Sequence, residues 1–197
     1  MNKRYLKNNS LAFVIIFACS IILAAIVGGL VYKIPSYQKI EFFISTTYID
    51  DSYFNTEIKK VDGVKKVNII TRSPSNKYYE ETLQTIGLYS DLLIIPEKYL
   101  LLDNALTSFS PIDEKYFDEY NLNYDSYQKI VSDGLCYGII IYDKENDVNF
   151  FKDKIVFETD DRYVICVGKT TPNVINEPKN EKQNNNAYKA LMELLAN

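Results

Sequence analysis

The stretch that decides the fold is residues 39–96, KIEFFISTTYIDDSYFNTEIKKVDGVKKVNIITRSPSNKYYEETLQTIGLYSDLLIIP. Three of its apolar runs read as strands: KIEFFIST at 39–46, VKKVNIIT at 64–71 and LLII at 92–95. Helical stretches at about 50–60 and 76–88 separate them, and Asp50 or Asp51 can cap the first. Strands that alternate with helices predict a βαβαβ unit. We therefore expect a three-layer α/β domain with a mostly parallel sheet.

Beyond residue 96 the pattern is weaker, but a single domain over residues 39–197 accommodates it. The expected elements are short helices at 111–120 and 124–132, a strand at 137–142, a hairpin of strands at 154–158 and 161–168, and a closing helix at 187–196. A polar, Asn-rich loop at 173–186 precedes the closing helix.

Upstream of the domain, residues 11–32 read LAFVIIFACSIILAAIVGGLVY, 22 residues without a charge. As a helix this run would be about 33 Å long, which matches a hydrocarbon core of roughly 30 Å. A cleaved signal peptide is the alternative, but its apolar region is shorter and ends in a small-residue cleavage site that is missing here. The run predicts an uncleaved signal anchor that forms a single transmembrane helix in the lipid bilayer.

The charges beside this run predict its orientation. Lys3, Arg4 and Lys7 lie in the tail, residues 1–10, without an acidic neighbour. Basic residues beside a span stay in the cytoplasm, so the tail should be cytoplasmic. A short linker at 33–38 then leads to an extracytoplasmic domain at 39–197. The Asn-, Lys-, Tyr- and Ile-rich composition resembles that of AT-rich bacterial genomes, which indicates a bacterial plasma membrane.

Composition argues against several classes of function. The formal net charge is −4 and no basic stripe is visible, which speaks against nucleic acid as a partner. Histidine is absent, so zinc sites and imidazole-based triads cannot be assembled. No phosphate-binding glycine motif occurs either. We expect no enzyme activity, no metal and no cofactor.

Cys136 and Cys166 form either a disulfide or two separate buried thiols.

Four phrases of the chain carry a resemblance to a known family: KIEFFIST, SDLLIIPEKYL, YGIIIYD, and YVICVGKTTPN followed by NNNAYKALMELLAN. In arrangement and wording they resemble the type II periplasmic or extracellular solute-binding proteins of bacterial transporters, whose return strand and last helix the fourth phrase would represent. Members of that family have two lobes, whereas only a short turn separates residues 142 and 155 here. The resemblance therefore implies one truncated lobe.

This resemblance implies a membrane-anchored binding or interaction domain, an accessory component of a membrane transport complex with a membrane-protein partner, such as the components of an ABC transporter. A single lobe cannot close around a solute, so solute binding would be weak at most. A structural or regulatory subunit without solute binding is the alternative.

Open parallel sheets bind ligands at the carboxyl ends of their strands, which identifies the candidate site residues. They are Ser45, Thr46, Thr47, Tyr48, Thr71, Arg72, Ser73, Glu97 and Tyr99. Arg72 is the positive charge among them and would meet an anionic group. In the alternative interpretation, the Ser and Thr side chains cap helices or close turns, and Arg72 pairs with an acid.

Overall fold

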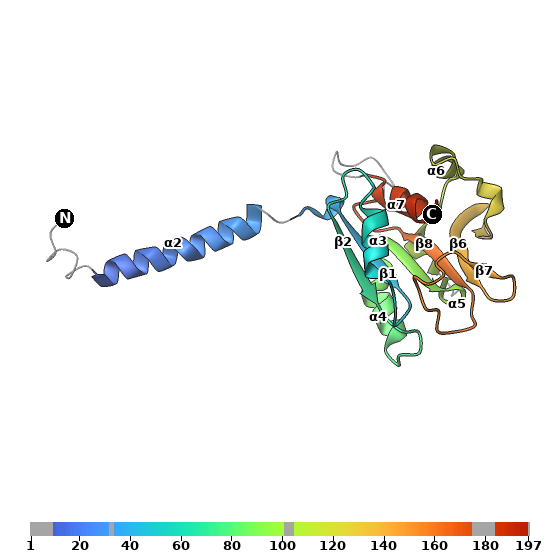
Figure 1. Cartoon of the computed structure of the whole chain (residues 1–197), viewed down its shortest axis with the longest axis horizontal. Helices are drawn as coiled ribbons and strands as arrows, with labels where there is room; N and C mark the ends of the chain where they lie inside the picture. The colour runs from blue at the N-terminus through green and yellow to red at the C-terminus, as the bar shows by residue number, and fades with distance from the viewer. Residues whose placement is uncertain (1–9, 32–33, 101–104, 175–183, 197) are drawn as a thin grey trace. The chain divides into compact units, whose positions relative to one another are not determined.

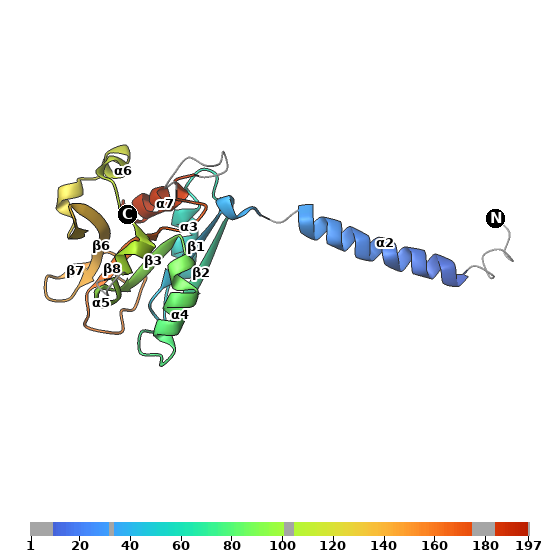
Figure 2. The same ribbon diagram turned by 180° about the vertical axis from the view of Figure 1, so that it is seen from behind.

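The structure is a computed structural model that describes residues 10–31, 34–100, 105–174 and 184–196. The chain divides into two compact units, Met1–Pro35 and Ser36–Asn197, which are drawn in Figures 1 and 2. The predicted tail lies outside the described residues except for residue 10.

The first unit contains helix α2 (Ser10–Val31), which covers the apolar run as far as residue 31; residue 32 lies outside the described residues. The side chains described for it are those of residues 14–25. Large apolar side chains are exposed there, among them Ile16 and Phe17, and Ser20 donates its hydroxyl hydrogen to the carbonyl of Ile16 (2.8 Å). Within the described part of the chain, no helix has the length and hydropathy needed to cross a membrane.

The second unit opens, after the 3-10 turn η1 (Ser36–Gln38), with the predicted βαβαβ pattern. Its elements are β1 (Lys39–Ile44), α3 (Asp51–Ile58), β2 (Lys66–Thr71), α4 (Tyr79–Thr85) and β3 (Leu92–Pro96). Asp50 caps α3 as expected, because its side chain accepts the Tyr53 N–H at 3.1 Å. Helix α4 is shorter than predicted and is followed by the 3-10 turn η2 (Gly87–Tyr89).

The rest of the second unit is built mainly from short elements. They are α5 (Glu97–Leu100), η3 (Ala105–Ser108), β4 (Phe109–Ser110), α6 (Glu114–Glu119), η4 (Tyr124–Ser126), β5 (Lys129–Ser132), β6 (Leu135–Asp143), β7 (Val148–Asn149), β8 (Tyr163–Gly168) and α7 (Asn186–Leu195). The predicted helices at 111–120 and 187–196 and the strand at 137–142 are confirmed, with boundaries that shift by up to three residues.

Two predictions in this region are wrong. Residues 124–132 form η4 and strand β5, not a helix, because a two-residue turn at Asp133 and Gly134 folds β5 back onto β6. Both turn residues have positive φ, 51° and 77°, as the tightest hairpin turns require. The hairpin of 154–158 with 161–168 is also absent. Residues 154–158 contribute only the isolated bridge between Ile49 and Ile155, and β8 pairs elsewhere.

A mixed sheet of eight strands lies at the centre of the described second unit, and its main path runs β2-β1-β3-β8-β6-β5. Strand β1 pairs in parallel with β2 and β3. From β3 onward every pairing is antiparallel, because β8 runs back between β3 and β6 and a hairpin turn joins β5 to β6. The prediction of a mostly parallel sheet is therefore wrong, since parallel pairing stays within the opening βαβαβ unit.

Helices cover both faces of this sheet, which gives the three layers expected (Figures 1 and 2). Helices α3, α6 and α7 pack on one face, while α4 and α5 pack on the other. Neighbouring residues of β1 divide between them: the Phe42 ring meets Phe54 of α3 edge-on at 5.6 Å, and the Phe43 ring lies 6.4 Å from Tyr79 of α4. The alternation of strand side chains thus fills two separate hydrophobic cores.

Gly168 ends β8 where the backbone passes very close to the start of β3. A Cβ atom at this position would lie 2.1 Å from the carbonyl oxygen of Ser90, a backbone atom that cannot rotate away. We predict that Gly168→Ala lowers the free energy of unfolding by about 1–3 kcal/mol, as overpacking in a fitted interior does. Urea denaturation would measure the loss, with exposed Lys152→Ala as the control. Equal stability of the two variants would contradict the close approach.

Candidate functional site

The carboxyl ends of β1, β2 and β3 lie side by side, as the predicted site requires. Ile44 pairs with Thr71 and with Ile94 in the parallel ladders. Just beyond the strands, the Ser45 N–H donates to the Ile94 carbonyl (2.9 Å) and the Arg72 N–H to the Ile44 carbonyl (3.1 Å). The predicted residues are therefore gathered at one end of the sheet, although their role in binding stays a prediction.

Two hydroxyl groups at this end, those of Ser45 and Thr46, form hydrogen bonds within the chain. Ser45 is fully buried, and its Oγ lies 2.6 Å from the Tyr79 hydroxyl. Thr46 is equally buried and donates to the Val156 carbonyl at 2.6 Å. Thr47, Tyr48 and Thr71 are exposed. The Thr46 hydroxyl also accepts the Tyr48 N–H and so closes a turn, as the alternative interpretation has it, whereas Ser45 makes a long-range contact that is neither a helix cap nor a turn.

Residues 154–162, which we name the strap, run across the same strand ends. Ser73 donates to the Glu158 carboxylate, and Arg162 forms an ion pair with Glu97 (Nη2 to Oε1 2.7 Å). A second ion pair joins Lys98 to Asp161 at 2.9 Å. Together with the hydrogen bond from Thr46, these contacts attach the strap to the residues that follow β1 and β2 and to α5. The strap thus covers part of the edge where a solute was expected.

Arg72 and Tyr99 are, besides the exposed Thr47, Tyr48 and Thr71, predicted site residues that keep accessible surface at this edge. Arg72 is exposed and makes no ion pair with any described residue. Tyr99 is half-buried, with its ring 4.9 Å from that of Tyr79 and the Lys98 ammonium 5.4 Å above it. What remains open is therefore a basic and aromatic surface, not an enclosed pocket.

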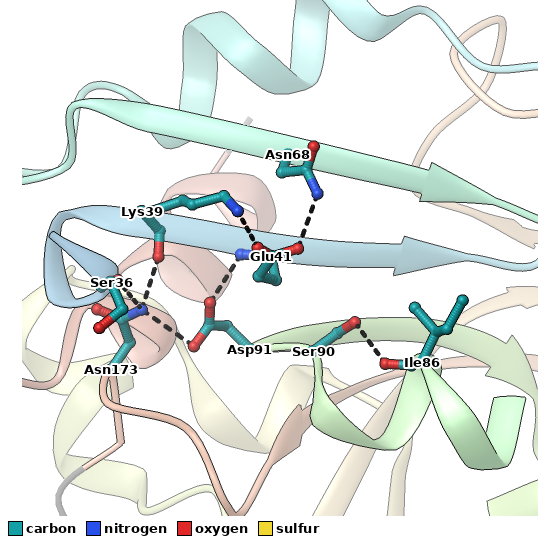
Figure 3. A network of polar contacts seen from close by, with 8 residues as sticks. All are labelled: Ser36, Lys39, Glu41, Asn68, Ile86, Ser90, Asp91 and Asn173. Atoms are coloured by element: carbon teal, nitrogen blue, oxygen red, sulfur yellow. Dashed lines mark hydrogen bonds and ion pairs between the residues drawn. The ribbon is translucent and has the colours of Figure 1, made fainter. Parts of the chain in front are cut away.

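At the opposite end of these strands, a buried carboxylate organises the network drawn in Figure 3. The Asp91 side chain is 2% exposed and accepts the Glu41 N–H (2.7 Å) and the Asn173 side-chain amide (3.0 Å). Its own N–H donates to the Glu41 carbonyl (2.8 Å), and its carbonyl accepts the Gly168 N–H (3.0 Å). Asp91 therefore joins β1, β3, the end of β8 and the loop after it. This hydrogen-bond network holds elements of the fold together.

A cavity of about 470 Å³ lies elsewhere, beside the β5–β6 turn, and sequence reasoning missed it. Its lining comes from the start of α6, η4, the turn and α7: Pro111, Ile112, Asp113, Glu114, Lys115, Tyr116, Tyr124, Gly134, Leu135, Cys136 and Tyr188. Its volume falls within the roughly 300–1,000 Å³ typical of ligand pockets. The abundance of tyrosine was the available signal, but these residues are far apart in sequence.

Tyrosine rings give the cavity its character. Tyr116 and Tyr188 stack with centroids 4.4 Å apart and planes only 7° from parallel. The Tyr188 hydroxyl donates to the Pro111 carbonyl (3.1 Å), which fixes the ring. Burial raises the pKa of Tyr124 to about 12, so its hydroxyl stays neutral. The cavity thus offers neutral aromatic surface beside charged side chains.

The two cysteines of this unit are free thiols and lie in different cores. Cys136 belongs to the core under α6 and α7, whereas Cys166 belongs to the core under α4. The sheet separates them, so a bridge between them would require refolding. Burial raises the pKa of both thiols, which opposes nucleophilic reactivity. Among the described residues, no group of three or more potential ligands of the Cys, Asp and Glu types could hold a metal ion.

No protein family matches the chain, and no curated protein is significantly similar to it in sequence.

Asp91→Asn tests the buried network. Both carboxylate oxygens accept hydrogen bonds, so the amide would place a donor against either the Glu41 N–H or the Asn173 amide in each orientation. We predict a loss of about 1–3 kcal/mol in the free energy of unfolding at neutral pH. Urea denaturation measures it, with exposed Asp62→Asn as the control. A variant as stable as the control would contradict the assignment.

The same substitution has a predicted pH dependence. Burial raises the pKa of Asp91 above the ordinary carboxyl value of 3.8, so the folded chain holds this proton more tightly than the unfolded chain. The protonated Asp91 carboxyl therefore contributes to the stability of the folded chain at low pH, and this contribution is lost as pH rises through the raised pKa. The cost of Asp91→Asn should therefore shrink as pH rises above about 4.

Proposed function

We propose that the chain is a membrane-anchored, extracytoplasmic interaction domain and an accessory component of a membrane transport complex, in which it contacts a membrane-protein partner. The observation that carries this proposal is the strap across the strand ends. Hydrogen bonds and ion pairs within the chain already occupy part of the edge where a solute-binding lobe would hold its ligand. A protein partner remains a suitable occupant of the outer surface around Arg72 and Tyr48.

The anchor is supported by the sequence and side chains of α2. The 22 residues Ser10–Val31 contain no charge. Among residues 14–25 the apolar side chains are exposed at consecutive positions, Val14, Ile15, Ile16 and Phe17, which point to all sides of a helix. The polar Ser20 satisfies its hydroxyl within the helix. Such a surface is stable in lipid and costly in water.

The resemblance to a solute-binding lobe is supported by the place of β8. Residues 163–168 resemble that family's return strand, and β8 runs antiparallel between β3 and β6. Only residues 144–162, which include β7 and the strap, lie between β6 and β8 in sequence, so no second lobe is inserted there. A one-lobe domain of this kind would act through its surface.

A structural or regulatory subunit with no link to transport is the second candidate. The partly covered strand edge is equally compatible with this second candidate, because a subunit of that kind needs no solute site. Transporter components recovered with the protein from membranes would favour the accessory role, whereas a different membrane complex would favour the alternative.

The first test concerns topology. Because the tail is basic and the span is charge-free, protease added to intact spheroplasts should digest residues 36–197 and spare a tag placed before residue 1. Immunoblotting with antibodies to each end measures this, and a cytoplasmic protein serves as the control for lysis. A protected domain would contradict the proposed orientation.

The second test concerns the partner. We predict that a photocrosslinker at exposed Thr47 traps a membrane protein in native membranes, and that Arg72→Glu reduces its yield several-fold because it reverses the charge of the open surface. Lys65→Glu is the matched control, since it makes the same change beside the other end of β2. Thermal unfolding should be unchanged in both variants. Equal yields from both, or no crosslinked protein at all, would contradict a partner at the strand ends.

A further inference from the structure

The segment that supplies most of the cavity lining is acidic. Residues 111–136 contain six acidic residues, Asp113, Glu114, Asp118, Glu119, Asp125 and Asp133, and two lysines, Lys115 and Lys129, which gives a net charge of −4. All six carboxylates are exposed. This region would attract a positively charged partner.

The carboxylates at the cavity differ in what they already bind. Asp113 caps α6 by accepting the Lys115 N–H, and it also pairs with the Lys115 ammonium at 3.0 Å. Glu114 lines the cavity, is exposed, and makes no ion pair with any described residue. The cavity therefore presents one carboxylate that is free to accept a cation.

The rings of the cavity already attract cations of the chain itself. The Lys115 ammonium lies 5.0 Å from the Tyr116 ring centroid, and the Lys129 ammonium lies 3.7 Å from that of Tyr124. Ammonium and guanidinium groups are drawn to the faces of such rings. A guanidinium group would have to displace these ammonium groups from the rings, and it has the advantage that it stacks and also donates two parallel hydrogen bonds to the free carboxylate.

The mouth of the cavity adds apolar contact. Leu135, in the lining, is 47% exposed, and Val131 of the same hairpin is 56% exposed. A free amine would leave the Leu135 side chain in water, whereas a peptide segment would cover it. The apolar mouth therefore favours a polypeptide over a small cation.

We propose that this cavity docks an arginine-containing basic segment of a partner protein, with a guanidinium group on Glu114 and the tyrosine rings. The inference rests on the proposed function, because it assumes that the domain works by binding a protein. It adds a second contact surface, separate from the strand ends, and gives the chemistry of the segment that occupies it.

The test uses the full chain in nonionic detergent with fluorescein-labelled tetra-arginine amide as the probe and fluorescence anisotropy as the measurement. Tetra-citrulline amide has nearly the same shape without the charge and should not bind. Glu114→Gln should weaken binding roughly tenfold, since it removes the charge-assisted pair. Glu119→Gln removes the same charge from the same helix outside the lining, and should change binding by less than about twofold.

A steric variant separates docking from general attraction to an acidic surface. Leu135→Trp keeps every charge but fills the mouth, so it should abolish binding, whereas non-specific attraction would survive it. Unchanged thermal unfolding would confirm that each variant is folded. Equal weakening by Glu114→Gln and Glu119→Gln, undiminished binding to Leu135→Trp, or no binding of tetra-arginine would each overturn the inference.

Failure here is distinguishable from failure of the proposed function. If tetra-arginine does not bind but the crosslinker at Thr47 still traps an Arg72-dependent membrane protein, the cavity inference is wrong and the interaction domain stands. If no protein is trapped at Thr47 and tetra-arginine does not bind, both are wrong.

Discussion

The buried carboxylate of Asp91 is the constraint on which the rest of the second unit depends. It lies where the parallel and antiparallel parts of the sheet meet, and it holds Glu41 of β1 and Asn173 of the loop after β8 (Figure 3). A buried carboxylate is costly unless its oxygens accept hydrogen bonds, so this residue requires its partners to stay in place. Gly168 allows the close approach, because any side chain there would meet the Ser90 carbonyl. Register and direction of β8 follow from this junction.

The direction of β8 decides what happens at the far end of the sheet. An antiparallel strand beside β3 must begin at the carboxyl end of β3, so the segment before it crosses the strand ends. That segment is the strap, and its ion pairs with Glu97 and Lys98 hold it there. The edge that parallel topology would leave open for a ligand is therefore partly covered by the same change of direction that completes the sheet.

The sequence predicts the opening half of the fold well, because its signals there are local. Four apolar residues after Asp91, closed by Pro96, indicate a doubly covered strand, and Asp50 is an ordinary N-cap. The later half fails where non-local pairing decides. Residues 124–132 have no strong strand pattern, and the informative signal was the Asp133–Gly134 turn. Residues 154–158 contain an apolar run typical of a strand but make only one bridge, since β3 and β6 already flank β8.

The candidate site shows the same division. Topology predicted that Ser45, Thr71 and Glu97 lie at one end of the sheet, and they do. Whether a hydroxyl there faces a ligand or its own chain depends on a segment more than 100 residues away, as the hydrogen bond from Thr46 to Val156 illustrates. The cavity is less predictable still, because helix α6, the β5–β6 turn and α7 each contribute a part. The acidic segment at that cavity and the strand ends around exposed Arg72 are two separate surfaces. One partner would have to match both, and a complex of two different subunits would satisfy them separately.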